Sequence, residues 1–127
     1  MGVVMIVVVN NEARVRDALR RVLEQAGYEV RAFARGGDAL QMVAWSAVEL
    51  VISDRTNFPM DGVEFVRRVR ERSNVPVVFV SAWADELEDQ LRETQLAADD
   101  YIQAPFSLSD VVARVRAVLA QRRAGAP

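Results

Sequence analysis

The stretch VELVISDRTNFPMDG, residues 48–62, joins an apolar run to a polar loop that begins with Asp54. Nearly continuous apolar runs are typical of central parallel strands that are covered on both faces. The run therefore predicts a buried strand over Val48–Ser53 with a polar carboxyl end. Further strand-like runs occur at Val3–Val9, Tyr28–Phe33, Val75–Val80 and Asp99–Ile102.

Apolar residues at helical spacing lie between and after these runs. The first set is followed by Gly27, a predicted C-terminal cap, and the last follows Ser107-x-x-Asp110, a variant of the capping box. Five strands alternating with five helices predict an α/β fold with a doubly wound parallel sheet. The helical positions are Val15, Leu19, Val22, Leu23 and Ala26; Leu40 and Val43; Val63, Val66 and Val69; Leu87, Leu91 and Leu96; Val111, Val112, Val115, Val118 and Leu119.

The composition excludes several classes of chemistry. The chain of 127 residues has a net charge of −2 and contains no histidine, no cysteine and no lysine, so that all 16 basic residues are arginine. Histidine bases, cysteine nucleophiles, Cys/His zinc sites, lysine Schiff bases and the lysine of a P-loop are all absent. The first strand is followed by Asn10-Asn11-Glu12-Ala13, without the glycine of a phosphate-binding loop. A small flavodoxin-like enzyme or nucleotide binder is therefore only a remote alternative, and we expect no enzymatic activity.

Charge and hydropathy also limit the partners. Acidic and basic residues are interleaved, as in the arginines between positions 67 and 72 beside Glu64 and Glu71, which favours a solvated helix face over an anion site. We therefore expect no direct binding of nucleic acid. Val3–Val9 is too short to span a membrane, so a cytoplasmic domain is predicted. The expected domain covers residues 1–121, and residues 122–127 begin a linker or C-terminal tail.

Several polar or small residues follow the predicted strands. Because right-handed crossovers place every strand-to-helix loop on one edge of the sheet, these residues should gather there. They are Asn10, Asn11 and Glu12 after the first strand, Asp54 after the third, Ser81 after the fourth, and Gln103, Ala104 and Pro105 after the fifth.

Four segments in this order resemble the receiver domain of two-component response regulators, over residues 3–121. That CheY-like family has the strand order 2-1-3-4-5 with five flanking helices. The segments are Val8-Val9-Asn10-Asn11-Glu12; Val51-Ile52-Ser53-Asp54 with Met60-Asp61-Gly62; Val77-Val78-Phe79-Val80-Ser81-Ala82; and Ala98-Asp99-Asp100-Tyr101-Ile102-Gln103-Ala104-Pro105-Phe106.

The resemblance implies roles for individual residues. Asp54 stands at the phosphoacceptor position, which in the family receives a phosphoryl group from a kinase phosphohistidine with the help of Mg²⁺. Asp54 and the backbone of Thr56 would belong to the metal site, while Ser81 and Tyr101 stand at the switch positions. The residues alone also fit simpler roles: Ser81 as a helix cap, Tyr101 as cover for the sheet, and Asp54 as a solvated carboxylate.

The sequence departs from the family at three positions. The acidic pair that holds the metal is replaced by Asn10 and Asn11, and the lysine that contacts the phosphoryl group by Ala104. Two carboxylates, the acceptor and the lysine would carry a formal charge of −2, whereas the four residues present carry −1. Amide oxygens bring no charge to offset the dehydration of Mg²⁺. We expect weak or absent metal binding.

These departures predict an atypical receiver, or pseudo-receiver, in bacterial signal transduction. It would act without Mg²⁺-dependent phosphorylation, on a protein partner or on an attached DNA-binding output domain, and no cofactor is expected. The alternative is a conventional receiver that binds Mg²⁺ and is phosphorylated at Asp54 by a sensor histidine kinase.

A second resemblance concerns the fourth helix, fifth strand and fifth helix. Their charged residues are similar to the face through which receivers of winged-helix, OmpR-like regulators form dimers. The residues of this predicted dimer face are Asp99, Asp100, Asp110 and Arg114. Mixed charges suit a self-complementary two-fold interface, and they equally suit a solvated surface with intrachain pairs.

Overall fold

The computed structural model describes residues 3–54, 56–57, 60–81, 89–92 and 98–125. Its main sheet contains five parallel strands in the order β2-β1-β3-β6-β7. Counted along the chain this is the order 2-1-3-4-5, so the predicted doubly wound α/β fold is confirmed. The strands are β1 (Met5–Val9), β2 (Glu29–Phe33), β3 (Val48–Ser53), β6 (Val77–Ser81) and β7 (Asp100–Gln103).

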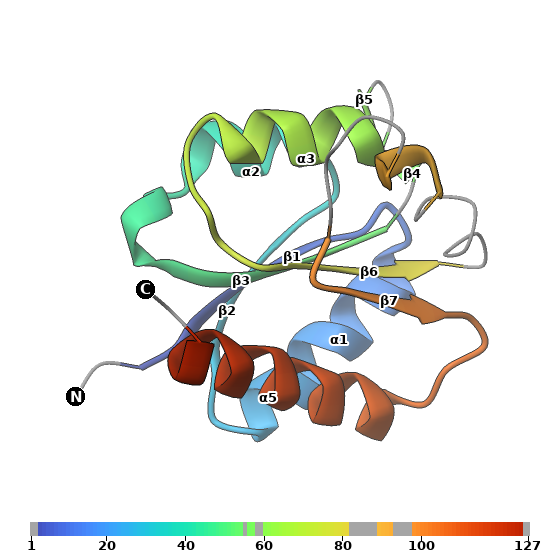
Figure 1. Cartoon of the computed structure of the whole chain (residues 1–127). Helices are drawn as coiled ribbons and strands as arrows, with labels where there is room; N and C mark the ends of the chain where they lie inside the picture. The colour runs from blue at the N-terminus through green and yellow to red at the C-terminus, as the bar shows by residue number, and fades with distance from the viewer. Residues whose placement is uncertain (1–2, 55, 58–59, 82–88, 93–97, 126–127) are drawn as a thin grey trace.

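Helices cover both faces of the sheet (Figure 1). On one face lie α1 (Ala13–Gln25) and α5 (Leu108–Gly125), and on the other lie α2 (Gly36–Met42) and α3 (Gly62–Arg70). A single 3₁₀ turn, η1 (Trp45–Ala47), leads into β3. Residues 89–92 are helical, while most of the predicted fourth helix lies outside the described residues. In the described part of the chain, no helix has the length and apolar composition that a membrane span requires.

The core consists of two apolar clusters separated by the sheet. Successive side chains of a strand point to opposite faces, and in β1 Val7 and Val9 join one cluster while Ile6 and Val8 join the other. The first cluster packs under α2 and α3 and contains Phe65, which is fully buried. All five predicted apolar positions of α5 are buried against the second cluster. Cover on both faces explains why the central strands are apolar throughout.

The ends of the elements follow the predicted caps in two places. Gly27, two residues past the end of α1, has φ +101°, a backbone conformation that residues with a Cβ rarely adopt. The Ser107 hydroxyl accepts a hydrogen bond from the Asp110 N–H at 3.1 Å, as in a capping box. Helix α5 continues to Gly125, four residues past the predicted domain end, and Arg122 in this extension donates to the Asn74 carbonyl. The domain boundary itself stays a prediction.

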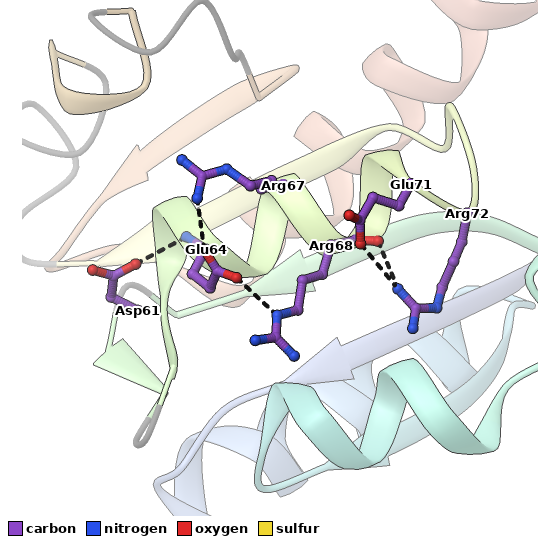
Figure 2. A network of polar contacts seen from close by, with 6 residues as sticks. All are labelled: Asp61, Glu64, Arg67, Arg68, Glu71 and Arg72. Carbon is purple, nitrogen blue, oxygen red and sulfur yellow. Dashed lines mark hydrogen bonds and ion pairs between the residues drawn. The ribbon is translucent and has the colours of Figure 1, made fainter.

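Asp61 caps helix α3, and its removal should destabilise the domain. The Asp61 carboxylate accepts a hydrogen bond from the Glu64 N–H at 2.9 Å (Figure 2). Asp61→Ala leaves this N–H without its acceptor and is expected to lower the free energy of unfolding by about 1 kcal/mol. Urea denaturation measures the change. Asp61→Asn keeps an oxygen acceptor and should stay within a few tenths of a kcal/mol of the wild type; equal losses in both variants would contradict the capping role.

Candidate functional site

Asp54 lies at the carboxyl edge of the sheet, directly after β3. Its N–H continues the strand pairing by donating to the Val9 carbonyl at 3.0 Å, and its side chain is half-buried. The buried Ser53 hydroxyl donates to the Asp54 carbonyl at 2.9 Å. One carboxylate oxygen, Oδ2, accepts a hydrogen bond from the Asn11 N–H at 2.9 Å. The structure therefore brings Asp54 and the loop after β1 together, as the sequence predicts.

The loop after β1 is fixed by hydrogen bonds within itself. Asn10 is only 5% exposed, and its side-chain oxygen accepts from the Glu12 N–H at 2.9 Å. The Asn10 carbonyl accepts from the Arg16 guanidinium at 2.9 Å. Arg16 is half-buried on the first turns of α1, and its own N–H donates to the Glu12 carbonyl at 2.9 Å. Asn10 is therefore held at both its side chain and its main chain.

Ser81 and Ala104 face each other at the same edge of the sheet. The Ala104 N–H donates to the Ser81 carbonyl at 2.9 Å, which extends the pairing of β6 with β7 by one residue. Both residues are half-buried, and the peptide bond between Ala104 and Pro105 is cis. The methyl group of Ala104 thus stands where the family carries a lysine, and it brings no charge to the site.

Tyr101 points into the apolar cluster that lies under α2 and α3. Its ring is stacked on the buried Phe79, with the ring centroids 6.1 Å apart and the planes inclined by 14°. The Tyr101 hydroxyl accepts a hydrogen bond from the Ala98 N–H at 3.1 Å. The aromatic ring at this predicted switch position is therefore half-buried and turned inward.

The loop after Asp54 forms a short antiparallel pair of strands, β4 (Thr56–Asn57) and β5 (Met60–Asp61). Thr56 is paired with Asp61, whose carboxylate caps α3. The backbone of the predicted metal-site residue Thr56 is thus part of a hairpin. Its side chain, like positions 55, 58 and 59, lies outside the described residues.

Two residues of the predicted dimer face are paired within the chain. Arg114 Nη1 lies 2.9 Å from both carboxylate oxygens of Asp100. This hydrogen bond and the charge of Asp100 raise the pKa of the exposed Arg114 guanidinium. Asp110 is exposed in the first turn of α5. A dimer contact through this face stays a prediction, because intrachain pairs and a two-fold interface both fit the charges.

Asp99, the fourth residue of that predicted face, makes its contacts elsewhere. Its carboxylate accepts from the Val77 N–H at 2.9 Å and lies 3.8 Å from Arg70 and 3.4 Å from Arg122. Burial lowers the pKa of the Arg70 guanidinium, while the charge of Asp99 acts in the opposite direction. These contacts tie the start of β6 to α3 and to the end of α5.

Arg67, Arg68 and Arg72 lie on a solvated face, as the sequence predicts, whereas Arg70 is half-buried and donates to the Val75 carbonyl at 2.6 Å. Glu64 pairs with Arg67 at 2.9 Å and with Arg68 at 2.8 Å, and Glu71 lies 3.7 Å from Arg72 (Figure 2). The arginine side chains in these pairs are between 41% and 54% exposed. Such exposed pairs contribute about 0–1 kcal/mol each.

Comparison with known proteins places this arrangement in a family. The family model described as the response regulator receiver domain matches residues 6–116. The chain belongs to the response regulator receiver family. The receiver is 33% identical over 114 residues to the sensory transduction protein RegX3 of Mycolicibacterium smegmatis (strain ATCC 700084 / mc(2)155), which covers 90% of this chain and 50% of the relative. The receiver thus spans about half the length of that curated relative.

Solved structures share the fold over nearly the whole receiver. The BeF3-activated DrrB receiver domain is 27% identical, with a TM-score of 0.80, and the match covers 94% of this chain and 99% of the other. A response regulator receiver domain from Clostridium thermocellum has a TM-score of 0.84 at 17% identity, covering 95% of this chain and 98% of the other. The latter likeness concerns the fold alone.

Receiver domains conventionally bind Mg²⁺, and the amides at positions 10 and 11 offer that ion no charged ligand. Mg²⁺ prefers near-octahedral oxygen ligands that include one or two carboxylates. The Asn10 side-chain oxygen already accepts the Glu12 N–H, and one oxygen of Asp54 already accepts the Asn11 N–H. Within the described ranges, no three acidic side chains gather as a metal-binding group. Among the positions that the family uses, Asp54 supplies the single carboxylate.

Arg16 is the residue near the site that sequence reasoning missed. The sequence points to Glu12 as a charge near Asp54, but the guanidinium that reaches this loop comes from α1. The available signal was its position four residues after Glu12, which places Arg16 one helical turn above the loop.

Proposed function

We propose that this receiver is atypical and works in bacterial signal transduction without Mg²⁺-dependent phosphorylation of Asp54. It would act on a protein partner or on an attached DNA-binding output domain in the cytoplasm. The proposal rests on the surroundings of Asp54. Amide side chains replace both acids of the family, and the Asn11 N–H donates a hydrogen bond to the Asp54 carboxylate at 2.9 Å.

The charge balance supports this function. The pair of carboxylates and the lysine are lost together, which leaves Asp54 as the only charge among the four corresponding positions. The positive charge of a lysine at position 104 would be balanced only by the Asp54 carboxylate. The absence of the lysine is therefore consistent with the absence of the two acids. The remaining site has too little negative charge to offset the dehydration of Mg²⁺.

The conformational part of the domain supports a signalling role. Ser81 keeps a hydroxyl at the end of β6, and Tyr101 is packed inward against Phe79. Because the Tyr101 ring is turned inward, the Asp100–Arg114 pair lies on the surface formed by β7 and α5. We infer that a partner, or a second copy of this chain, reads that surface. We propose no direct contact between this domain and nucleic acid.

The conventional function remains the second candidate. Asp54 keeps the acceptor carboxylate at the end of β3, and the relative that is 33% identical is a sensory transduction protein. In this alternative a sensor histidine kinase phosphorylates Asp54, and Asn10 or Glu12 helps to hold the metal ion.

Magnesium titration distinguishes the two functions. We expect no saturable change in the amide resonances of Asn11 or Asp54 at magnesium concentrations that saturate a conventional receiver. The reason is the missing charge at positions 10 and 11. Calcium and sodium at matched ionic strength control for nonspecific screening. A saturable shift confined to the residues around Asp54 and specific to Mg²⁺ would favour the conventional function instead.

A further inference from the structure

One peptide group links a guanidinium to the carboxylate of Asp54. The carbonyl of the Asn10–Asn11 peptide accepts from Arg16 at 2.9 Å, and the N–H of the same peptide donates to Asp54 Oδ2 at 2.9 Å. The peptide is trans, so its carbonyl and its N–H point in opposite directions. Arg16 and Asp54 therefore lie at the two ends of one peptide dipole.

The direction of this dipole suits both charges. The positive guanidinium faces the negative end of the peptide group, and the negative carboxylate faces the positive end. Hydrogen bonds with an ionised partner are shorter and stronger than neutral ones, and successive bonds polarise one another. Each of these two bonds therefore strengthens the other. The arrangement places positive potential on the Asn11 N–H, where Asp54 binds.

The surrounding contacts hold this peptide in place. The Asn10 side chain binds the Glu12 N–H, and the Asn10 N–H donates to the Phe33 carbonyl at 3.0 Å. Arg16 is half-buried in the first turns of α1, where its main-chain N–H donates to the Glu12 carbonyl. The carboxylate thus meets a donor of fixed position.

We propose that Arg16 is a positioning residue for Asp54, acting through the Asn10–Asn11 peptide group. Its guanidinium supplies, from the far side of the peptide, the positive charge that the family obtains from a metal ion. This inference deepens the proposed function and rests on it, since a carboxylate held in this way is stabilised without a metal ion.

The Asn11 amide reports the arrangement directly by NMR. A hydrogen bond to a carboxylate moves the amide proton resonance downfield, and polarisation by Arg16 moves it further. Arg16→Met is expected to shift this resonance upfield, Arg16→Gln by less, and Arg16→Lys least, since lysine keeps the charge. Exchange of the Asn11 amide with solvent should become about tenfold faster in Arg16→Met, as for loss of part of a charge-assisted bond.

Arg20→Gln provides the matched control. Arg20 lies one turn further along α1 and pairs with Asp17 at 3.9 Å and with Glu24 at 3.1 Å, both on the same helix. It should leave the Asn11 resonance unchanged. In an Asp54→Asn background the Arg16→Met shift should shrink, because the two bonds are coupled.

Three outcomes decide the inference. The inference is supported if the upfield shift of the Asn11 amide resonance decreases from Arg16→Met to Arg16→Gln to Arg16→Lys and is absent in Arg20→Gln. Equal Asn11 resonances in the wild type and all Arg16 variants would overturn it, as would an equal change in Arg20→Gln. If Arg16→Met fails to fold, the Gln and Lys variants carry the comparison. Phosphorylation of Asp54 in a protein with the ordered response would overturn the proposed function alone.

Discussion

Asn10→Asp combined with Asn11→Asp is expected to create a magnesium site beside Asp54. The two new carboxylates would supply the charge and the hard oxygen ligands that Mg²⁺ requires. Changing only the residues that hydrogen-bond to metal ligands alters metal affinity about 10–100-fold, so restoring the ligands themselves should raise the Mg²⁺ affinity by about a hundredfold or more. Isothermal titration calorimetry measures this gain against the wild type.

The same double variant should show magnesium-dependent stability. Asn10 is 5% exposed, so a carboxylate at this position is desolvated and close to Asp54 when no cation is bound. Without Mg²⁺ the variant should therefore melt below the wild type. At a hundred times the dissociation constant, Mg²⁺ should return about 2.7 kcal/mol, which corresponds to about 10 °C in a domain of this size.

A pair of changes at the opposite edge provides the control. Asn74→Asp combined with Gln121→Glu also converts two amides to acids, but Asn74 precedes β6 and Gln121 lies near the end of α5. This variant has the same net charge as the double variant and should show no magnesium-dependent melting. If both variants respond alike, or if neither binds Mg²⁺, the charge-based account of the site is wrong.

Much of the fold could be predicted from the apolar pattern. The run over Val48–Ser53 coincides with β3, because alternate side chains of this strand enter two different apolar clusters. The predicted strand Val75–Val80 begins two residues before β6 and ends one residue before it, since β6 covers Val77–Ser81. Val75 is buried but unpaired in the sheet, with its carbonyl bound by Arg70 at 2.6 Å. An apolar run therefore indicates which residues are buried, whereas the ends of a strand depend on which backbone groups find a hydrogen-bond partner.

The sequence predicts the parts of the site that are placed by the ends of the strands. It does not predict the contacts that long side chains make. The approach of the Asn10–Asn11 loop to Asp54 follows from the topology of a parallel sheet. Residue types alone do not predict the bond from Arg16 to a main-chain carbonyl, and the position of Arg16 four residues after Glu12 is the signal that the sequence offers. In the same way, the charges of Asp100 and Arg114 cannot tell an intrachain pair from a contact between two copies.

Wild-type protein treated with acetyl phosphate and Mg²⁺ is expected to remain unmodified at Asp54. Phosphoryl transfer depends on neutralising the charge that develops on the transferred group, and this site holds neither the acidic pair for a metal nor the lysine. Because the chain contains no histidine, lysine or cysteine, few other side chains can take up the donor group. The expected effect is a near-complete loss of modification relative to a conventional receiver treated in parallel.

Intact mass spectrometry of the treated protein shows whether Asp54 accepts a phosphoryl group. Asp54→Asn serves as the control for modification elsewhere, and a receiver that carries both acids and the lysine confirms that the donor is active. Signalling without phosphorylation of Asp54 predicts one dominant species with the mass of the unmodified chain. Stoichiometric addition of one phosphoryl group, present in the wild type and absent in Asp54→Asn, would contradict it.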